Sequence, residues 1–217
     1  MLPAPEGCRH CLFWQQNCEL QGAVRVDVGR CNGYIGRMTE QNDLSPIPIL
    51  IAPHPLLKAK ARKVVPGDAD EIRALIPRMF AAMYDAPGIG LAAPQVGISL
   101  RMAVIDLAAN DIRAPLVIVN PEIMAASTEL RVHEEGCLSL PHQFADVTRP
   151  SRIKLRYEDA NGVRQEIEAD GLLATCLQHE IDHLNGILFV DHISALKRNM
   201  IMRKLAKEQR IKLAEKA

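Results

Sequence analysis

The chain has 217 residues, a formal net charge of zero at pH 7 and 48% hydrophobic residues. This composition excludes a disordered polymer and is sufficient for one substantial hydrophobic core. No run approaches the roughly 18 uninterrupted apolar residues of a membrane-spanning helix. The first 37 residues also lack the charged and apolar regions of a secretory signal. We therefore expect a cytoplasmic protein that has no membrane partner.

The first 37 residues lack clear periodicity and are followed by a polar stretch with two prolines, residues 38–50. The N-terminal segment, residues 1–44, contains four of the six cysteines, which are Cys8, Cys11, Cys18 and Cys31. Four thiolates can bind zinc, but the CxxC spacing of the first pair is not repeated. Two interpretations stay open: a disordered or non-native extension, and a small Cys-rich knot. We expect the main domain to span residues 45–193.

The predicted elements of this domain begin with a helix from Asp68 to Tyr84. Apolar residues recur there at spacings of three and four, and acidic residues occupy its first turn. Short runs rich in β-branched residues follow at 101–107 and 115–120. The stretch 151–169 reads as a hairpin, because "DANG" stands at a natural turn position.

A second helix is predicted over residues 170–186, where leucines form an apolar face and Gly186 ends the helix. The pattern predicts an α+β fold with antiparallel or mixed sheets packed around this central helix. The last segment, residues 194–217, has eight basic and two acidic residues and a helix-forming composition. We expect a basic C-terminal helix, which is either a solvated helix or a surface for an anionic partner.

The sequence "QHEIDHLNG" on the second predicted helix has the spacing of a metal site. His179 and His183 are one helical turn apart, so both imidazoles can bind one divalent ion. Glu180 stands between them. An adjacent carboxylate of this kind can take a proton from water that the ion polarises. The pattern leaves the third ligand undefined.

Several residues were considered as the third ligand. The HExxHxxGxxH pattern would place a histidine where the chain has Phe189, which cannot bind a metal. Glu208 is a downstream carboxylate but lies in the basic tail. Cys176 is seven residues from His183, about 10.5 Å along a helix, which is too far to share an ion. Cys137 in "EEGCLSLP" remains a candidate, although a lone cysteine is more often an inert core residue.

The stretch "GIGLAAPQVG", residues 88–97, contains a GxGxxA core. A dinucleotide-binding loop must follow a strand and open a helix, whereas this stretch follows a helix and contains Pro94. We therefore expect no nucleotide cofactor. The glycines favour close approach of a peptide backbone, and Gln95 offers an amide donor that could stabilise an oxyanion.

Taken in this order, "GIGLAAPQ", "EGCLS" and "QHEIDH" resemble the motifs of the peptide deformylase family. The similarity covers residues 45–195. It implies a metal-dependent hydrolase that removes the N-formyl group from the formyl-methionine of new polypeptides and releases formate. The ligands implied by the resemblance are Cys137, His179 and His183. Glu180 would be the general acid and base, while Gln95 and the backbone N–H of Leu138 would form the oxyanion site.

The resemblance also implies how substrate, metal and partners are bound. Ile89, Gly90 and Gly136 would pair with the substrate backbone. Leu172 and Cys176 would line the methionine pocket. The expected ion is Fe²⁺, with Zn²⁺, Ni²⁺ or Co²⁺ able to replace it. The nascent formyl-Met polypeptide is the expected partner, and the basic C-terminal helix would approach the ribosome. Phe144 departs from the family pattern, in which a basic residue is common.

Two rival functions were considered, a zinc endopeptidase that uses Glu208 and a silent module that only binds N-terminal peptides. We treated the remaining histidines as ordinary surface or packing residues. They are His10, His54, His133, His142 and His192.

Overall fold

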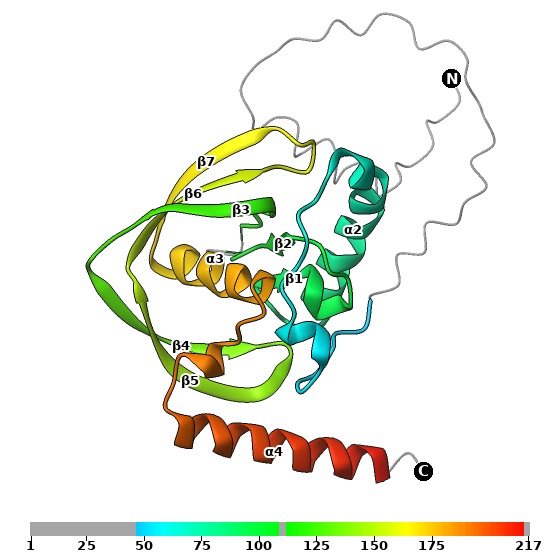
Figure 1. Ribbon diagram of the computed structural model, residues 1–217, viewed down its shortest axis with the longest axis vertical. Helices are drawn as coiled ribbons and strands as arrows, with labels where there is room; N and C mark the ends of the chain where they lie inside the picture. Colours follow the sequence, from blue (N-terminus) through cyan, green and yellow to red (C-terminus); the bar gives the residue numbers. More distant parts are fainter. Residues whose placement is uncertain (1–46, 109–111, 215–217) are drawn as a thin grey trace, which may run out of the picture. The chain divides into compact units, whose positions relative to one another are not determined.

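The computed structural model describes residues 47–108 and 112–214 (Figure 1). The chain divides into two units, Met1–Gln41 and Asn42–Ala217, and all described residues belong to the second. The Cys-rich knot considered for residues 1–44 lies outside the described residues. No helix in the described part of the chain is long and apolar enough to cross a membrane.

A five-stranded antiparallel sheet, in the order β1-β2-β3-β6-β7, forms one side of the described unit. Its strands are β1 (Gly90–Ala92), β2 (Met102–Ile105), β3 (Leu116–Ala126), β6 (Arg152–Glu158) and β7 (Arg164–Asp170). The predicted hairpin is confirmed as β6 and β7, which pair in continuous antiparallel register. A separate two-stranded sheet contains β4 (Leu130–Cys137) and β5 (Leu140–Pro150).

The β4–β5 hairpin was not predicted from the sequence. Strand prediction relies on alternation of apolar and polar residues, with the apolar ones facing the core. On β4 the core-facing position carries Glu135, and on β5 it carries Arg149, and each is 5% exposed. The two side chains form an ion pair, so a charged pair occupies part of the buried face where alternation would require apolar residues.

The helices follow the predicted positions. They are α2 (Ala69–Asp85), α3 (Gly171–Leu184) and α4 (Ala195–Ala214). Short 3₁₀ helices are η1 (Pro55–Lys58), η2 (Pro66–Asp68), η3 (Ala93–Val96) and η5 (Phe189–Asp191). Gly186, two residues after α3, has φ 74°, a conformation that favours glycine, and it ends the helix as predicted.

Helix α3 lies inside the curve of the strands, while α2 covers the opposite face of the five-stranded sheet (Figure 1). Strand β2 shows the layering, because its side chains alternate between the two helices. Ala103 and Ile105 pack in the core with α3, whereas Met102 and Val104 pack in the core with α2. The expected α+β fold with antiparallel sheets around a central helix is confirmed.

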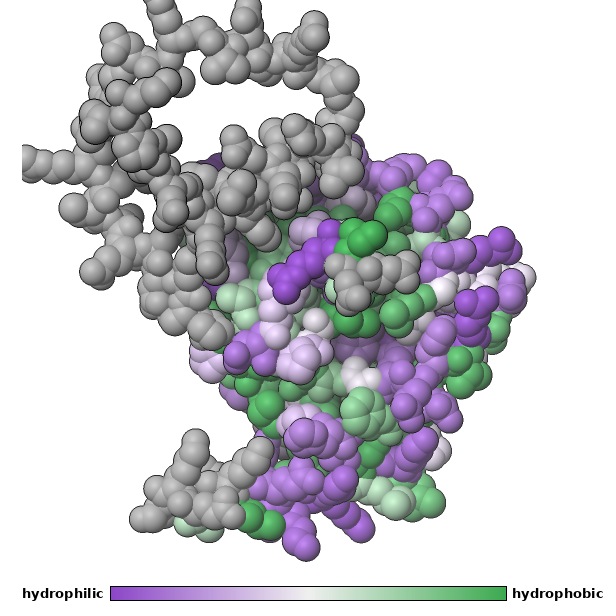
Figure 2. Space-filling view, turned by 180° about the vertical axis from the view of Figure 1, so that it is seen from behind, coloured by the Kyte–Doolittle hydropathy of each residue, from purple (hydrophilic) through white to green (hydrophobic). Residues whose placement is uncertain are grey.

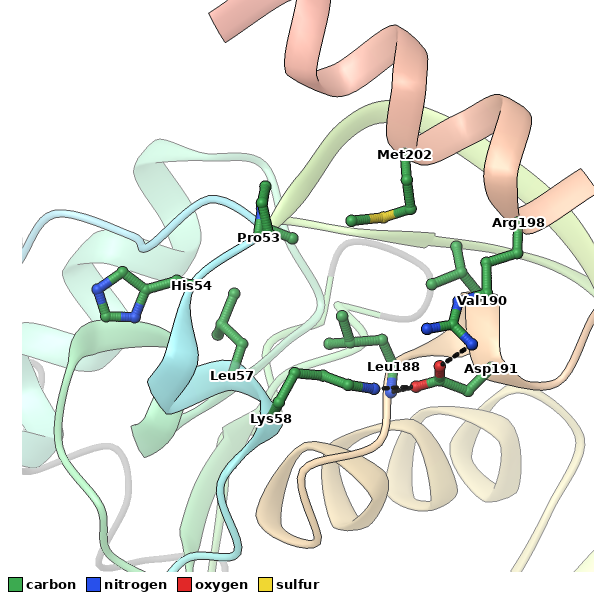
Figure 3. Close-up of a pocket in the computed structure, with 10 residues that line it drawn as sticks. Pro53, His54, Leu57, Lys58, Leu188, Val190, Asp191, Arg198 and Met202 are labelled. Carbon is green, nitrogen blue, oxygen red and sulfur yellow. Dashed lines mark hydrogen bonds and ion pairs between the residues drawn. The ribbon is translucent and has the colours of Figure 1, made fainter. Parts of the chain in front are cut away.

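Helix α4 packs on the body through its apolar residues. Ile201 and Leu205 join a core cluster with Leu140, Val147 and Phe189. Figure 3 shows the pocket between η1, η5 and α4 that borders this contact. At its rim Asp191 pairs with Lys58 at 2.6 Å and with Arg198 at 3.4 Å. The tail that was predicted to be a basic helix is therefore a helix packed against the rest of the described unit.

Candidate metal centre

Three potential metal ligands converge where β4 ends beside α3. The Sγ atom of Cys137 lies 3.2 Å from His183 Nε2, and the ring centroids of His179 and His183 are 4.9 Å apart. All three ligand atoms lie within 4.8 Å of one another. The β4–β5 register shifts at this point, because Gly136 pairs with Phe144 whereas Cys137 pairs with Leu140. Irregular pairing of this kind often re-aims a side chain, and here the thiol reaches the helix.

The two histidines are held on a buried part of α3. His179 is 9% exposed and His183 is 1% exposed. Burial lowers the pKa of His183, which favours the neutral imidazole that a metal requires. Phe189, at the position where one protease pattern has a third histidine, instead stacks on the His179 ring with centroids 6.3 Å apart. Phe189 therefore supports the candidate ligand His179 by packing against its ring.

Glu135 and Arg149 orient His179, and the sequence analysis did not identify either of them. The Nδ1 atom of His179 lies 2.9 Å from Glu135 Oε2, which leaves Nε2 free to face an ion. Burial would raise the pKa of Glu135, but hydrogen bonds from His179 and Arg149 outweigh it and lower this pKa to about 2. Glu135 is therefore an anion, the usual partner of a metal-binding imidazole. The only local sequence feature that could have identified Glu135 is that it is the second of two acidic residues before Gly136 and Cys137.

Arg149 links this carboxylate to the helix. Its guanidinium donates to both oxygens of Glu135 and also to Asp182 on α3 at 2.7 Å. Asp182 in turn lies 2.7 Å from His192 Nε2. The network fixes the hairpin and the helix relative to each other, and these two elements supply all three ligands.

Glu180 faces the centre from the same helix and is 3% exposed. Burial raises its pKa to about 7, a change that His179 opposes and Glu135 reinforces. Its Oε2 atom has no hydrogen-bond partner among the described residues. A Cβ atom at Gly90 would collide with Glu180 Oε1, so only glycine leaves room for this carboxylate. A buried carboxyl group with a pKa near neutrality can accept and return a proton.

Gln95 is directed at the same centre from η3 and is 1% exposed. Its Oε1 accepts the backbone N–H of Ala92 at 2.8 Å, which fixes the orientation of the amide. Its Nε2 then donates to Ser139 Oγ at 3.2 Å and points at Cys137 Sγ at 3.6 Å. Ser139 was missed by the sequence analysis, although it belongs to the "EGCLS" motif.

Two of the residues predicted to bind substrate are in contact with each other. Ile89 is 39% exposed, and its carbonyl accepts the Cys176 thiol at 3.7 Å. Leu172 is 50% exposed and lies one turn before Cys176 on α3. Burial raises the pKa of Cys176, so this thiol stays protonated.

The two motif segments that face each other across the centre are in close contact. The Leu138 side chain packs over Gly88, where a Cβ atom would lie 2.7 Å from Leu138 Cδ1. Gly136 lies under the Phe144 ring, where a Cβ atom would be 2.6 Å away. The absence of side chains at both glycines brings the two backbones close to the metal ligands.

The donor set fits a divalent transition-metal ion. One thiolate and two imidazoles are the ligand types that zinc and ferrous iron accept, and hard cations such as Mg²⁺ prefer oxygen. The His183 Nε2 and Cys137 Sγ atoms lie 3.2 Å apart within the described structure. A catalytic site with three protein ligands keeps a further position open.

Comparison with known proteins decides the family. The sequence model of the polypeptide deformylase family matches residues 46–199. The chain belongs to this family. Among relatives, the peptide deformylase of Agrobacterium fabrum is 50% identical over 167 residues, covering 76% of this chain and 98% of the relative. That of Mesorhizobium japonicum is 54% identical over 161 residues, covering 74% of this chain and 91% of the relative.

Solved structures of peptide deformylases agree with this assignment. The enzyme from Legionella pneumophila superposes with a TM-score of 0.73 at 46% identity, covering 78% of this chain and 98% of the other. The enzyme from Synechococcus elongatus in complex with actinonin gives a TM-score of 0.69 at 45% identity, covering 73% of this chain and 87% of the other. The deformylase fold expected from the three motifs is thus confirmed, and the chain is a member of a metal-dependent hydrolase family.

Proposed function

We propose that this deformylase removes the N-formyl group from the N-terminal formyl-methionine of nascent polypeptides and releases formate. The observation that carries the proposal is the convergence of the Cys137, His179 and His183 ligand atoms within 4.8 Å of one another. The Nε2 atom of Gln95 lies 3.6 Å from Cys137 Sγ, and Glu180 directly follows His179 on α3. These groups are of the kinds that formamide hydrolysis uses, which are metal ligands, a proton carrier and an oxyanion donor.

Cys137, His179 and His183 would hold the ion. When bound, the ion supplies Lewis-acid polarisation of water and of the formyl carbonyl group. A thiolate places more negative charge at the site than a third imidazole, so it polarises water less strongly and makes a protein base more necessary. The thiolate also suits a softer ion, and we propose Fe²⁺ in the cell with Zn²⁺, Ni²⁺ or Co²⁺ able to replace it.

Glu180 moves the proton. With a pKa of about 7, its carboxylate takes a proton from the attacking water and later delivers it to the leaving amine nitrogen. Its free Oε2 atom has no competing hydrogen bond within the described residues. The proton transfer therefore requires no other contact of this carboxylate to break.

The Nε2 amide of Gln95 and the backbone N–H of Leu138 would hold the oxygen that becomes negative during attack on the formyl carbon. The Ala92 N–H already fixes the orientation of the Gln95 amide, and its Nε2 atom is directed toward Cys137. Donors fixed in a dry site stabilise a developing charge more strongly than mobile water.

The nascent chain would add as an extended strand beside β1. In the five-stranded sheet β1 is at the edge, and β4 pairs only with β5 among the described strands. The free edges of the two strands would offer backbone groups at Gly90 on one side and at Gly136 on the other, whereas the carbonyl of Ile89 already accepts the backbone N–H of Asp106 at 2.9 Å. The methionine side chain would enter beside Leu172 and Cys176. The formyl carbon bears a hydrogen atom where the carbonyl carbon of an internal peptide bond bears a Cα atom. A tight site therefore excludes internal peptide bonds.

Formate release from formyl-Met peptides, measured anaerobically with metal analysis of the same samples, tests the proposal. Anaerobic handling matters because a ferrous ion beside a thiolate is open to oxidation. Glu180→Ala should lower kcat by about 100-fold to 10,000-fold while the bound metal is retained. Absence of formate from the metal-loaded wild type contradicts the proposal.

The same experiment separates the two rival functions. An endopeptidase that uses Glu208 would cleave unblocked internal peptide bonds and tolerate Cys137→Ala. A silent binding module would show no turnover in the wild type and would keep its peptide affinity after Glu180→Ala. Release of formate that depends on both Cys137 and Glu180 excludes both rivals.

We further propose that α4 binds ribosomal RNA. Its exposed basic residues are Lys197, Arg198, Arg203, Lys204, Lys207 and Arg210. Figure 2 shows mainly hydrophilic residues along this helix at the bottom of the view. Lys204→Glu should weaken cosedimentation with ribosomes and make it less dependent on salt, because each phosphate contact releases a counterion. Lys60→Glu, an equal charge change outside α4, is the matched control, and equal effects of both variants contradict the proposal.

A further inference from the structure

The proposed mechanism leaves one buried polar atom of the hairpin unexplained. The Nε2 atom of His133 is buried and has no hydrogen-bond partner among the described residues. Two other such atoms, Glu180 Oε2 and His183 Nδ1, belong to the metal centre. Buried polar atoms without partners are rare in native proteins. The sequence analysis treated His133 as a surface or packing residue, and this atom indicates a further role.

The position of His133 on β4 directs its ring toward α3. Side chains alternate between the two faces of a strand, so His133 shares a face with Glu135, two residues later. Glu135 contacts His179 on α3 at 2.9 Å. Pro150, which pairs with the start of β4, accepts a hydrogen bond from Gln178 of the same helix at 3.1 Å. Contacts with α3 therefore lie on both sides of His133.

The facing stretch of α3 carries the residues proposed to receive the first side chain of the substrate. Leu172, Cys176 and His179 recur at spacings of four and three, so they share one stripe of the helix. Leu172 is 50% exposed, whereas Cys176 is 5% exposed. Leu172 is a large apolar residue that stays half exposed beside the buried Cys176. A substrate side chain that covers Leu172 would explain this exposure.

We propose that His133 lines the site of the substrate's methionine side chain, beside Leu172 and Cys176. In this site it donates a hydrogen bond from Nε2 to the thioether sulfur. The inference rests on the proposed function and names a specificity residue for it. In the tautomer that carries its proton on Nε2, this ring has a buried donor, and a thioether, although a weak acceptor, supplies a partner for it. Norleucine has the same shape as methionine with a CH₂ group in place of sulfur. His133 therefore selects methionine over norleucine.

The test measures kcat/KM of the metal-loaded full-length chain for two formylated tripeptides, which differ only in having methionine or norleucine first. The wild type should prefer methionine by about threefold to tenfold, the range expected for one weak net hydrogen bond. His133→Leu removes the donor, and the ratio should fall to about one. His133→Gln keeps an amide donor and should restore part of the preference.

Val132→Ala, on the opposite face of β4, is the matched control and should keep the wild-type ratio. A wild-type ratio near one overturns the proposal without any variant, so the test remains valid if His133→Leu fails to fold. An unchanged ratio in folded, metal-containing His133→Leu overturns it as well. Release of formate from neither peptide would instead contradict the proposed function, so the two failures are distinct.

Discussion

His179 presents Nδ1 to the carboxylate of Glu135 at 2.9 Å, and this contact joins α3 to β4 at the metal centre. The same carboxylate accepts two hydrogen bonds from Arg149, so it is fixed from both sides. An imidazole whose far nitrogen is held in this way offers its other nitrogen to a metal in one tautomer and one orientation. The affinity for the ion thus depends on residues that do not bind it.

The first prediction concerns this carboxylate. Glu135→Gln keeps the shape of the side chain but removes the negative charge shared by His179 and Arg149. We expect the dissociation constant for the metal to rise by about 10-fold to 100-fold, the usual effect of losing an outer partner of a ligand. Competition with a chromophoric chelator measures it. Glu134→Gln, at the exposed neighbouring position, should bind like the wild type, and equal affinities of the two variants would show that the contact is unimportant.

The second prediction concerns the space that Gly90 leaves for Glu180. A Cβ atom at Gly90 would overlap Glu180 Oε1 and lie 2.9 Å from Cys176 Sγ, so Gly90→Ala must displace the carboxylate. We expect kcat for formate release to fall by about 10-fold or more, because general acid and base catalysis depends on placement. Metal content should be unchanged. Gly67→Ala, where a Cβ atom meets nothing within 4 Å, should have wild-type kcat.

Residues close in sequence were predictable, and residues joined through the hairpin were not. The helical spacing of His179 and His183 is a local pattern, so it predicted two ligands and a base between them. Elimination left Cys137 only as a candidate, and the family resemblance then singled it out, because its approach to α3 depends on the irregular pairing of β4 and β5 at Cys137. No periodic signal marks that irregularity.

Glu135 and Arg149 show the same limitation. They lie 14 residues apart and meet because β4 and β5 pair, so neither could be identified until the hairpin was known. The hairpin itself was hidden by this pair, since charged side chains at core-facing positions break the alternation that marks a strand. The residues that orient His179 therefore obscured the hairpin that carries Cys137.

The third prediction concerns stability and pH at Asp106. This 2% exposed carboxylate accepts the Tyr84 hydroxyl at 2.6 Å and the backbone N–H groups of Ala108 and Ala114. Burial would raise its pKa, but these hydrogen bonds and Arg113 outweigh burial and lower it. A depressed native pKa contributes stability above the ordinary value of 3.8, and this contribution is lost as pH falls through the native pKa.

Asp106→Asn should therefore reduce the free energy of unfolding at pH 7 by about 1 to 3 kcal/mol, the cost of weakening hydrogen bonds to a buried charge. The difference from the wild type should shrink as the pH is lowered below about 4. Urea unfolding of the metal-free proteins at several pH values measures it. Asp85→Asn, exposed at the end of α2, should change little. A difference between wild type and Asp106→Asn that is independent of pH would refute the assignment.

The fourth prediction separates two costs of replacing glycine after α3. Gly186 has φ 74°, and a Cβ atom there would lie 2.5 Å from the carbonyl oxygen of Lys58. Gly162, in the β6–β7 turn, has φ 76°, but a Cβ atom there would meet nothing within 4 Å. Gly162→Ala thus reports backbone strain alone, which costs about 1 to 2 kcal/mol. Gly186→Ala adds a collision with backbone, which cannot rotate away.

We expect Gly186→Ala to lower the free energy of unfolding, measured by urea denaturation, by about 1 to 3 kcal/mol more than Gly162→Ala, the range for strain in a packed structure. The contact matters for the metal centre because Gly186 follows His183 by three residues, and the Lys58 backbone fixes how the chain leaves α3. Metal affinity should therefore weaken in Gly186→Ala and remain unchanged in Gly162→Ala. Equal losses of stability in the two variants would mean that the chain after α3 moves away from η1 without cost.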